Sequence, residues 1–434
     1  MKTRVNKASN DLGSVLLIVM VITVVLGIGL AGYVTLARWQ HTSVVRSQAW
    51  NAALAMAEAG VEEALAQLNP SALLFTTNID RGANGWSLLA DGMYHAPRRT
   101  LPHGAYDVAL TADVYPKIYA TGYVTIPTLS TTLARKVAVT TTEGSLYRGL
   151  IAARVNVDLN GNRIMTDSFD SMDPNHSTGG LYDPAKRKAN GDVACTQGMI
   201  EVQNAEVRGT LYTGPTGSFS VGPNGTVGDL GWPLGAGMQP GHYKNDFNMD
   251  FPDVLPPYTT GLPPASGTFN GTNYTWVLGN ANYLYGDPKG AKFSTGEKIL
   301  VTGRARLYVT SDFLMAGGSS IIIAPGASLQ LYVGGANTSI ATLNNAGNCA
   351  TFTYFGLPSN RSVTLTGNDI FLGSIYAPNA DFTLSGGGDD MLDFQGACVV
   401  NTIGMNGHFN FHFDENLRRK GPVRGYQITS WTEL

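Results

Sequence analysis

Residues 12–68 decide the fold, and they begin with LGSVLLIVMVITVVLGIGLAGYVTLA (Leu12–Ala37). This first stretch contains no charged side chain. A helix needs about 20 apolar residues to span the hydrocarbon core of a bilayer. The run continues as RWQHTSVVRSQAWNAALAMAEAGVEEALAQL (Arg38–Leu68) without a helix breaker, until Asn69-Pro70 ends it. The sequence therefore predicts one long helix whose first half can cross a membrane.

The second half of this helix has one apolar face. Its apolar residues recur three or four positions apart: Ala49, Ala52, Ala53, Met56, Ala57, Gly60, Val61, Ala64, Leu65 and Leu68. This spacing is typical of an amphipathic helix that packs on one side. Because most of these side chains are small, we expect a sheet or another helix to approach closely.

The composition indicates a mainly β chain outside the helix. Only 14% of the 434 residues are charged and 52 are glycine, against roughly 25% charged and 7% glycine in average proteins. Abundant glycine with threonine, asparagine and tyrosine favours short strands and tight turns. The formal net charge of −3 gives no electrostatic case for nucleic acid as a partner, since such proteins are usually basic.

The N-terminus predicts the orientation of the helix in a membrane. Residues 1–13 form a basic leader with Lys2, Arg4 and Lys7. Basic residues before an apolar span favour the cytoplasmic side. We therefore expect a single-pass protein that contacts membrane lipid and has most of its chain outside the cytoplasm. A cleavable secretory peptide is the main alternative, but its apolar core is shorter, about 7–15 residues.

A family resemblance rests on three features: Gly13-Ser14, the run VLLIVMVITVVLG after them, and the Ala-rich second half of the helix. Over about residues 11–68 the chain resembles PilX-type minor pilins of the type IV pilus. The resemblance implies that a prepilin peptidase cuts after Gly13 and that Ser14 becomes the methylated N-terminus. It also implies a precursor in the bacterial inner membrane, and assembly with other pilins or pseudopilins in a pilus or at the cell surface. Most pilins carry Glu where this chain has Ile18, which favours a minor subunit.

Residues 70–148 predict a small antiparallel β unit. The segments 105–113, 117–126 and 133–143 alternate in polarity and are rich in β-branched residues. A sheet of three strands needs a second layer over one face. We expect the helix of residues 14–69 to supply that layer, and this is also the plan that the pilin resemblance implies.

Residues 149–434 predict a right-handed β-solenoid, with a β-sandwich as the alternative. The triplet Leu307–Val309 recurs as Leu331–Val333. A second short pattern recurs at Phe371–Ile375, Phe394–Cys398 and Val207–Leu211. A period near two dozen residues, made of short strands and turns, fits the stacked rungs of a solenoid.

One part of this region is rich in proline. Residues 223–264 hold 8 of the 21 prolines, and since proline is excluded from central strands, we expect an arm on the side of the solenoid.

A second resemblance lies in the β-rich region itself. It is similar to the domain often found behind PilX-type N-termini in bacterial surface proteins, in the segments Phe371–Gly386, His408–Leu417 and Ser168–Val193. This resemblance implies display at the cell surface and brings no activity with it.

Candidate metal ligands lie in one Asp-rich stretch. Asp167, Asp170 and Asp173 offer the oxygen ligands that calcium prefers. The spacing of an EF-hand is absent, and Asp before Ser, Pro or Gly is also ordinary turn and capping chemistry. The sequence therefore leaves calcium open as a cofactor.

His408, His412 and Asp414 alternate with phenylalanines near the C-terminus. In a strand this places the polar residues on one face, where they could bind a transition metal. No fourth ligand is evident. The alternative is a terminal strand with phenylalanine inward and polar groups outward.

The three cysteines, Cys195, Cys349 and Cys398, have no CxxC spacing, so no zinc site or thioredoxin-like pair is indicated. A Cys349–Cys398 disulfide and three buried thiols are both compatible with the sequence.

The sequence offers no catalytic set. Glycoside hydrolysis needs two carboxyls about 5–10 Å apart across a cleft. The pairs Asp389/Asp390 and Asp414/Glu415 are sequence neighbours, which point to opposite faces of a strand. We therefore expect a non-enzymatic pilus or pseudopilus component whose solenoid head serves adhesion or capping, with a surface glycan as a further partner. The alternatives are a membrane-anchored solenoid enzyme that acts on polysaccharide, and a plain anchored envelope protein.

Overall fold

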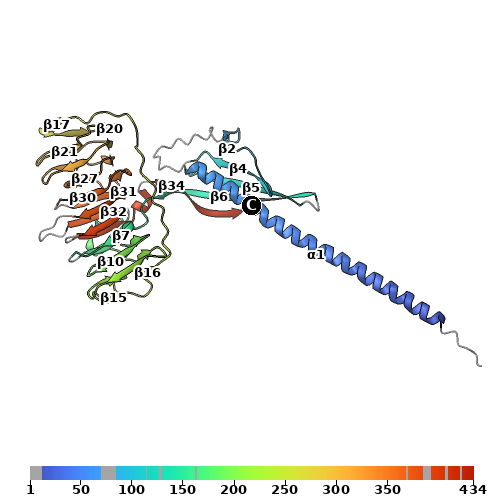
Figure 1. Ribbon diagram of the computed structural model, residues 1–434. Helices are drawn as coiled ribbons and strands as arrows, with labels where there is room; N and C mark the ends of the chain where they lie inside the picture. The colour runs from blue at the N-terminus through green and yellow to red at the C-terminus, as the bar shows by residue number, and fades with distance from the viewer. Residues whose placement is uncertain are drawn as a thin grey trace, which may run out of the picture. The chain divides into compact units, whose positions relative to one another are not determined.

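The computed structural model describes residues 12–69, 85–113, 115–126, 130–161, 164–367, 370–384, 392–405, 409–420 and 423–434. The chain divides into two compact units (Figure 1). The first unit contains Met1–Gln67, Asp80–Thr142 and Ile428–Leu434, and the second contains Leu68–Ile79 and Glu143–Gln427. Because the first unit resumes near the C-terminus, most of the second unit is an insertion in its sequence.

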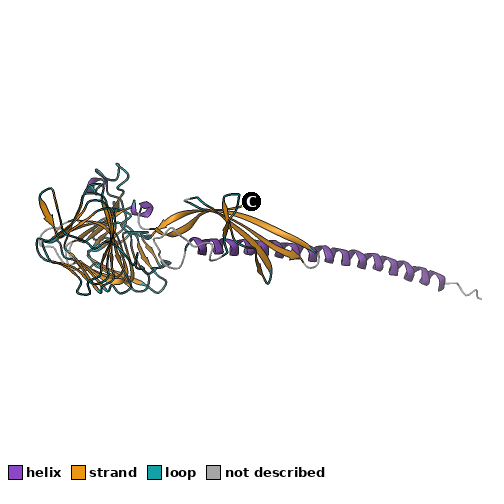
Figure 2. Ribbon diagram, turned by 90° about the horizontal axis from the view of Figure 1, so that it is seen from above, coloured by secondary structure: helices purple, strands orange, loops and turns teal. Residues whose placement is uncertain are grey.

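The long helix that the sequence predicts is confirmed. α1 runs without interruption over Leu12–Leu68, and Figure 2 shows its N-terminal half extending past the strands of the first unit. The large apolar side chains between Val15 and Leu36 are exposed, Leu16 by 72%. The helix stops before Asn69-Pro70 because a residue that precedes proline disfavours the helical conformation.

The first unit packs the second half of α1 on a seven-stranded sheet. Its strands are β1 (Ser87–Leu88), β2 (Met93–His95), β3 (Arg99–Leu101), β4 (Gly104–Thr111), β5 (Lys117–Ile126), β6 (Thr131–Ser145) and β34 (Val423–Glu433). The order is β1-β2-β4-β5-β6-β34, with β3 beside β4. The pairs among β1 to β6 are antiparallel. The three strands predicted over residues 105–143 are β4, β5 and β6.

Small residues bring the helix and this sheet into close contact. Ala53 and Ala57 have no exposed surface. A Cβ atom at Gly122 of β5 would lie 2.1 Å from the Ala53 carbonyl oxygen, and one at Gly60 of α1 would lie 3.1 Å from the Tyr106 ring. The Ala- and Gly-rich face of the helix therefore lets its backbone approach the backbone of the sheet, as its composition predicts.

The last strand of the chain completes this sheet, which sequence reasoning did not predict. β34 lies beside β6. The Arg135 side chain of β6 donates to Glu433 of β34 (Nε to Oε1, 2.6 Å). The Arg135 guanidinium also lies 4.9 Å from the centroid of the Trp50 ring on α1. The region predicted as solenoid over 149–434 therefore ends before this strand.

The second unit is a coil of stacked parallel strands in three rows. The first row contains β7 (Ile151–Asp158), β9 (Val193–Cys195), β12 (Leu211–Thr213), β16 (Tyr243–Lys244), β20 (Asn282–Tyr285), β23 (Arg304–Val309), β26 (Ser328–Val333) and β29 (Phe352–Gly356). The second contains β10 (Met199–Gln203), β13 (Ser218–Val221), β21 (Ala291–Phe293), β24 (Phe313–Met315), β27 (Asn337–Ile340) and β30 (Ser362–Leu365).

The third row contains β8 (Met165–Phe169), β11 (Glu206–Val207), β14 (Thr226–Val227), β15 (Gly237–Met238), β19 (Trp276–Leu278), β22 (Lys298–Val301), β25 (Ser320–Ile323), β28 (Thr342–Asn345) and β33 (Phe409–Asp414). β31 (Phe371–Leu384) and β32 (Leu392–Met405) are long strands that bend from one row to the next. The other described elements are the hairpin of β17 (Gly267–Phe269) and β18 (Thr272–Tyr274), a 3-10 turn (Pro184–Lys186) and α2 (Leu417–Lys420).

The sequence repeat corresponds to one turn of this coil. Leu307 pairs with Leu331, its counterpart in the next copy of the repeat, and Phe371 pairs in the same way with Phe394. Both pairs are parallel, which is the stacking that a solenoid requires. The β-sandwich alternative is wrong, because the sheets of a sandwich are antiparallel. The right-handed sense of the coil stays a prediction.

The chain enters the coil in the middle of the stack. β7 pairs with β9 and β10 on one side and with β32 on the other, and β8 lies between β11 and β33 in the same way. From this middle the chain winds to β16, crosses to the opposite end near β20, and winds back until β32 and β33 dock on β7 and β8 (Figure 1).

Residues 245–264 make this crossing along the outer side of the first row. The Tyr376 hydroxyl donates to the Pro252 carbonyl at 2.8 Å, and the Tyr258 hydroxyl donates to a carbonyl of β20 at 2.7 Å. The arm predicted over 223–264 is therefore too long. Its first part forms β14, β15 and β16, short strands between the prolines.

All three cysteines are buried free thiols, and the structure has no Cys349–Cys398 disulfide. Burial raises the pKa of each thiol. They therefore remain protonated and act as small apolar side chains in the core.

We predict that Gly122→Ala loosens the first unit, because the added methyl group meets the backbone of α1. Overpacking of this kind costs about 1–3 kcal/mol. Amide hydrogen exchange measured by mass spectrometry should become faster in β5 and in the second half of α1. Gly404→Ala is the matched control, since a Cβ atom there meets no atom within 4 Å. Equal exchange in the two variants would contradict the close packing.

Candidate functional site

The apolar half of α1 is the first candidate site. Among the described residues, one helix, within Val15–Leu68, is long and apolar enough to cross a bilayer, and none of its apolar window is buried. Its length and composition are compatible with a single-pass anchor. Gly13 and Ser14 lie in the first turn of α1, and the Ile18 side chain is 55% exposed. The basic residues of the leader, within 1–11, lie outside the described residues, and processing at Gly13 stays a prediction.

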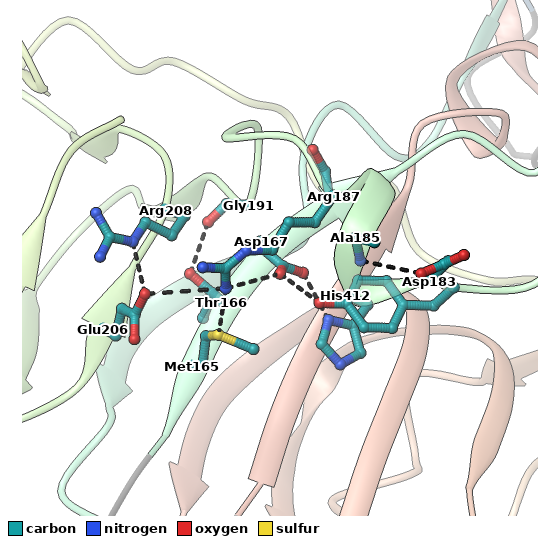
Figure 3. Close-up of polar contacts among 12 residues, drawn as sticks. Met165, Thr166, Asp167, Asp183, Ala185, Arg187, Gly191, Glu206, Arg208 and His412 are labelled. Atoms are coloured by element: carbon teal, nitrogen blue, oxygen red, sulfur yellow. Dashed lines mark hydrogen bonds and ion pairs between the residues drawn. The ribbon is translucent and has the colours of Figure 1, made fainter. Parts of the chain in front are cut away.

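A polar cluster where the coil closes on itself is the second candidate site. His412 of β33 pairs in register with Asp167 of β8, and its Nδ1 lies 2.5 Å from Asp167 Oδ1. The two side chains are 1% and 0% exposed. On the other side of the ring, Nε2 lies 3.5 Å from Asp393 Oδ1 of β32. Figure 3 shows Asp167 at the centre of this cluster, which we call the junction cluster.

The segment 171–190 covers the junction cluster from outside. Phe411 and Phe413 point into the coil and are buried, so His412 between them points outward. The Tyr182 ring stacks on the imidazole with centroids 3.5 Å apart. The predicted inward phenylalanines are therefore present, but the outward polar residues are buried rather than solvated, because a distant segment packs over them.

Cations and hydroxyl groups compensate the carboxylates of this cluster. The Tyr182 hydroxyl donates to Asp167 Oδ2 at 2.7 Å, and Arg187 Nη1 lies 3.6 Å from the same oxygen. Arg187 also approaches Glu206 at 3.9 Å, and Arg208 Nε donates to Glu206 at 2.6 Å. Carboxylates of low exposure thus alternate with guanidinium groups, as a region of low dielectric requires.

A further carboxylate, Glu415, ties the end of β33 to the covering segment. It accepts hydrogen bonds from Ser168 (2.9 Å), Asn190 (2.7 Å) and Lys188 (2.5 Å). Burial raises the pKa of Glu415, but these three donors outweigh that effect and hold its pKa below the usual value. Glu415 therefore stays anionic and keeps its partners at neutral pH.

The three predicted calcium ligands have separate protein partners. Asp167 binds His412 and Tyr182, Asp170 accepts from Arg419 (Nη2 to Oδ1, 2.6 Å), and Asp173 caps its own turn. Within the described ranges, no group of three His, Cys, Asp or Glu residues could hold a metal ion. Calcium at these residues stays a prediction without a supporting cluster.

The predicted transition-metal set also finds no support. His408 lies outside the described residues, and both ring nitrogens of His412 face carboxylates. Asp414, the third member, accepts from the Ser171 amide at 3.0 Å. His412 and Asp414 therefore hold the covering segment and the last strand of the coil together.

The junction cluster contains the side chains of acid–base chemistry, but its central pair, His412 and Asp167, is buried. Its histidine is 1% exposed beneath the Tyr182 ring, and Asp167 beside it has no exposed surface. The carboxylates Asp414 and Glu415 have separate partners, while Asp389/Asp390 lie outside the described residues. The geometry supports a structural role: the cluster holds β33 on β8 and orders the segment over them.

Sequence reasoning found some members of this cluster and missed others. The alternation with phenylalanine singled out His412, and the Asp-rich stretch singled out Asp167. Tyr182, Arg187 and Asp393 were missed, because no local pattern marks a residue whose partner lies far away in the sequence.

Comparisons with known proteins assign no activity to this chain. Residues 296–420, from β22 to α2, match the model of a family described as a domain of unknown function (DUF7305). No curated protein matches the chain. The crystal structure of the competence-associated pilin ComZ from Thermus thermophilus aligns over 88% of this chain and 96% of that chain, with 11% identity and a TM-score of 0.29. A TM-score this low does not establish a shared fold.

We predict that Asp167→Asn strongly destabilises the second unit. His412, Tyr182 and Arg187 then lose the charge that they surround, and breaking a buried pair costs about 3–5 kcal/mol. Urea denaturation should show the loss. Asp287→Asn is the control, since Asp287 is exposed in a turn of another rung and its side chain accepts from the Lys289 amide, where surface changes cost within about 0.5 kcal/mol. Similar losses in the two variants would contradict the role of the cluster.

The junction also makes stability depend on pH. Burial lowers the pKa of His412, but the hydrogen bonds and charges of Asp167 and Asp393 outweigh it and raise the pKa above the usual 6.5. Protonated His412 therefore stabilises the fold fully below about pH 6.5, and this stabilisation is lost as the pH rises through the folded-state pKa.

We predict that wild type loses stability relative to His412→Gln over this pH window, with a slope approaching about 1.4 kcal/mol per pH unit. Denaturation curves recorded from pH 6 upward measure the difference. The exposed His103→Gln variant should follow wild type. A constant difference between wild type and His412→Gln across the window would count against the pair.

Proposed function

We propose that this chain is a pilin-like cell-surface protein, a minor component of a type IV pilus or pseudopilus. The observation that carries the proposal is α1. Its exposed apolar half is continuous with a half that packs on an antiparallel sheet. A fully exposed apolar helix needs an apolar environment from outside the chain, and either a bilayer or the helices of other pilins supplies it.

In this proposal the precursor sits in the bacterial inner membrane with its leader in the cytoplasm. A prepilin peptidase cuts after Gly13, Ser14 becomes the methylated N-terminus, and the helix then joins other pilins. Ile18 lacks the carboxylate found in most pilins, which fits a subunit present in few copies better than one that builds the filament.

The coil is the displayed head in this proposal, and adhesion or capping is its task. Its sequence is inserted between β6 and β34, so two strands of the first sheet carry it. The head has no catalytic role, which the covered and paired carboxylates of the junction cluster support. Its partner class is a surface glycan or another exposed surface.

N-terminal sequencing of the protein made with and without a prepilin peptidase tests the proposal. We expect N-methyl-Ser14 when the peptidase is present, and Gly13→Leu should block the cut. Gly27→Ala is the control, because it changes a glycine within the apolar run that has open space around it. An intact Met1 in the membrane fraction, with the peptidase present, would favour the plain anchored envelope protein instead.

A further inference from the structure

The part of α1 that follows the uncharged run carries an exposed basic and aromatic surface. Arg38, Trp39, His41 and Arg46 are all exposed, Trp39 by 72%. We call these four residues the collar. They are part of one continuous helix with the apolar half, so their distance from the apolar run is fixed by helix geometry.

The charge of the collar has no counterpart on its own segment of helix. Between Leu12 and Ala57 the sequence contains no Asp or Glu, and the first acidic residue of α1 is Glu58. Two arginines therefore stand in an acid-free stretch beside an exposed tryptophan. A partner that complements this surface must be anionic and must lie beside the apolar run.

The helix geometry places the collar at the depth of lipid headgroups. At about 1.5 Å per residue the uncharged run is roughly 39 Å long, against about 30 Å for the hydrocarbon core. Arg38 and Trp39 therefore fall in the headgroup layer. Arg46 lies two turns further on, but side chains on a helix tilt toward its N-terminus, so its guanidinium reaches back toward the same layer.

We propose that the collar binds the phosphate groups of anionic phospholipids, with Trp39 seated among the headgroups. Arginine matches phosphate with two parallel hydrogen bonds, and tryptophan is enriched at the boundary between membrane and water. A second copy inserted to the same depth fits less well, because it sets arginine against arginine. This inference rests on the proposed membrane anchor.

Full-length protein in lipid vesicles tests the inference. The vesicles contain phosphatidylcholine, with or without phosphatidylglycerol, and a lipid with a spin label on its headgroup that quenches nearby tryptophan. We expect Trp39→Phe to remove most of the quenching, while Trp431→Phe, a change at an exposed tryptophan of β34, keeps it. The Arg38→Gln/Arg46→Gln double variant should lose the extra quenching that phosphatidylglycerol brings.

Flotation of the vesicles separates failure of the collar from failure of the anchor. If the protein floats with the vesicles but Trp39→Phe is quenched like wild type, or phosphatidylglycerol makes no difference, the collar inference is wrong and the anchor stands. If the protein does not float, both are wrong. A third outcome is quenching that disappears as more chains are loaded per vesicle. That result would mean that the collar binds the helix of a neighbouring copy, and it would overturn the lipid inference.

Discussion

The docking of β32 and β33 on β7 and β8 is the contact on which the coil depends. A single rung cannot bury its own apolar side, so each must stack on a neighbour. The chain enters the coil in the middle of the stack. One side of its first rung therefore has no neighbour until the last rungs return to it. Until His412 meets Asp167, a separation of 245 residues, the apolar interior on that side stays open. Contacts this distant in sequence carry a large entropic cost, since a long loop must close before they form.

The junction cluster explains why the coil closes in one register. A shift of one residue would turn His412 into the coil and bring a phenylalanine out, because side chains alternate along a strand. A shift of two residues would separate His412 from Asp167 and leave buried charges without partners. Buried ion pairs contribute little net stability, but an unpaired buried charge is costly. The cluster therefore acts by making alternative registers unfavourable, and Tyr182 extends this selection to the covering segment.

The coil is inserted in the sequence of the first unit, so the first sheet contains strands from both sides of the insertion. β6 leaves the sheet toward the coil, and β34 returns from it to pair with β6. The sheet is complete only when β34 pairs with β6, so the contact between Arg135 and Glu433 joins residues 298 positions apart across the inserted coil. Meanwhile the apolar half of α1 contributes to neither core. It stays free for a membrane or for other helices, and this division of one helix into two environments supports the proposed pilin-like role.

The sequence by itself determined the elements that repeat locally. The uncharged run and the small-residue face that follows it predicted α1 and its packing on a sheet. The repeat that joins Leu307 to Leu331 predicted the parallel rungs. Only the tertiary structure decided that β34 belongs to the first sheet, that the coil starts in its middle, and that Tyr182 covers His412. The physical reason is that a periodic pattern can be read within one stretch of sequence. A hydrogen bond or ion pair between two distant segments leaves no such pattern in the sequence of either segment. The polar face of β33 was visible in the sequence, but what lies over it was not.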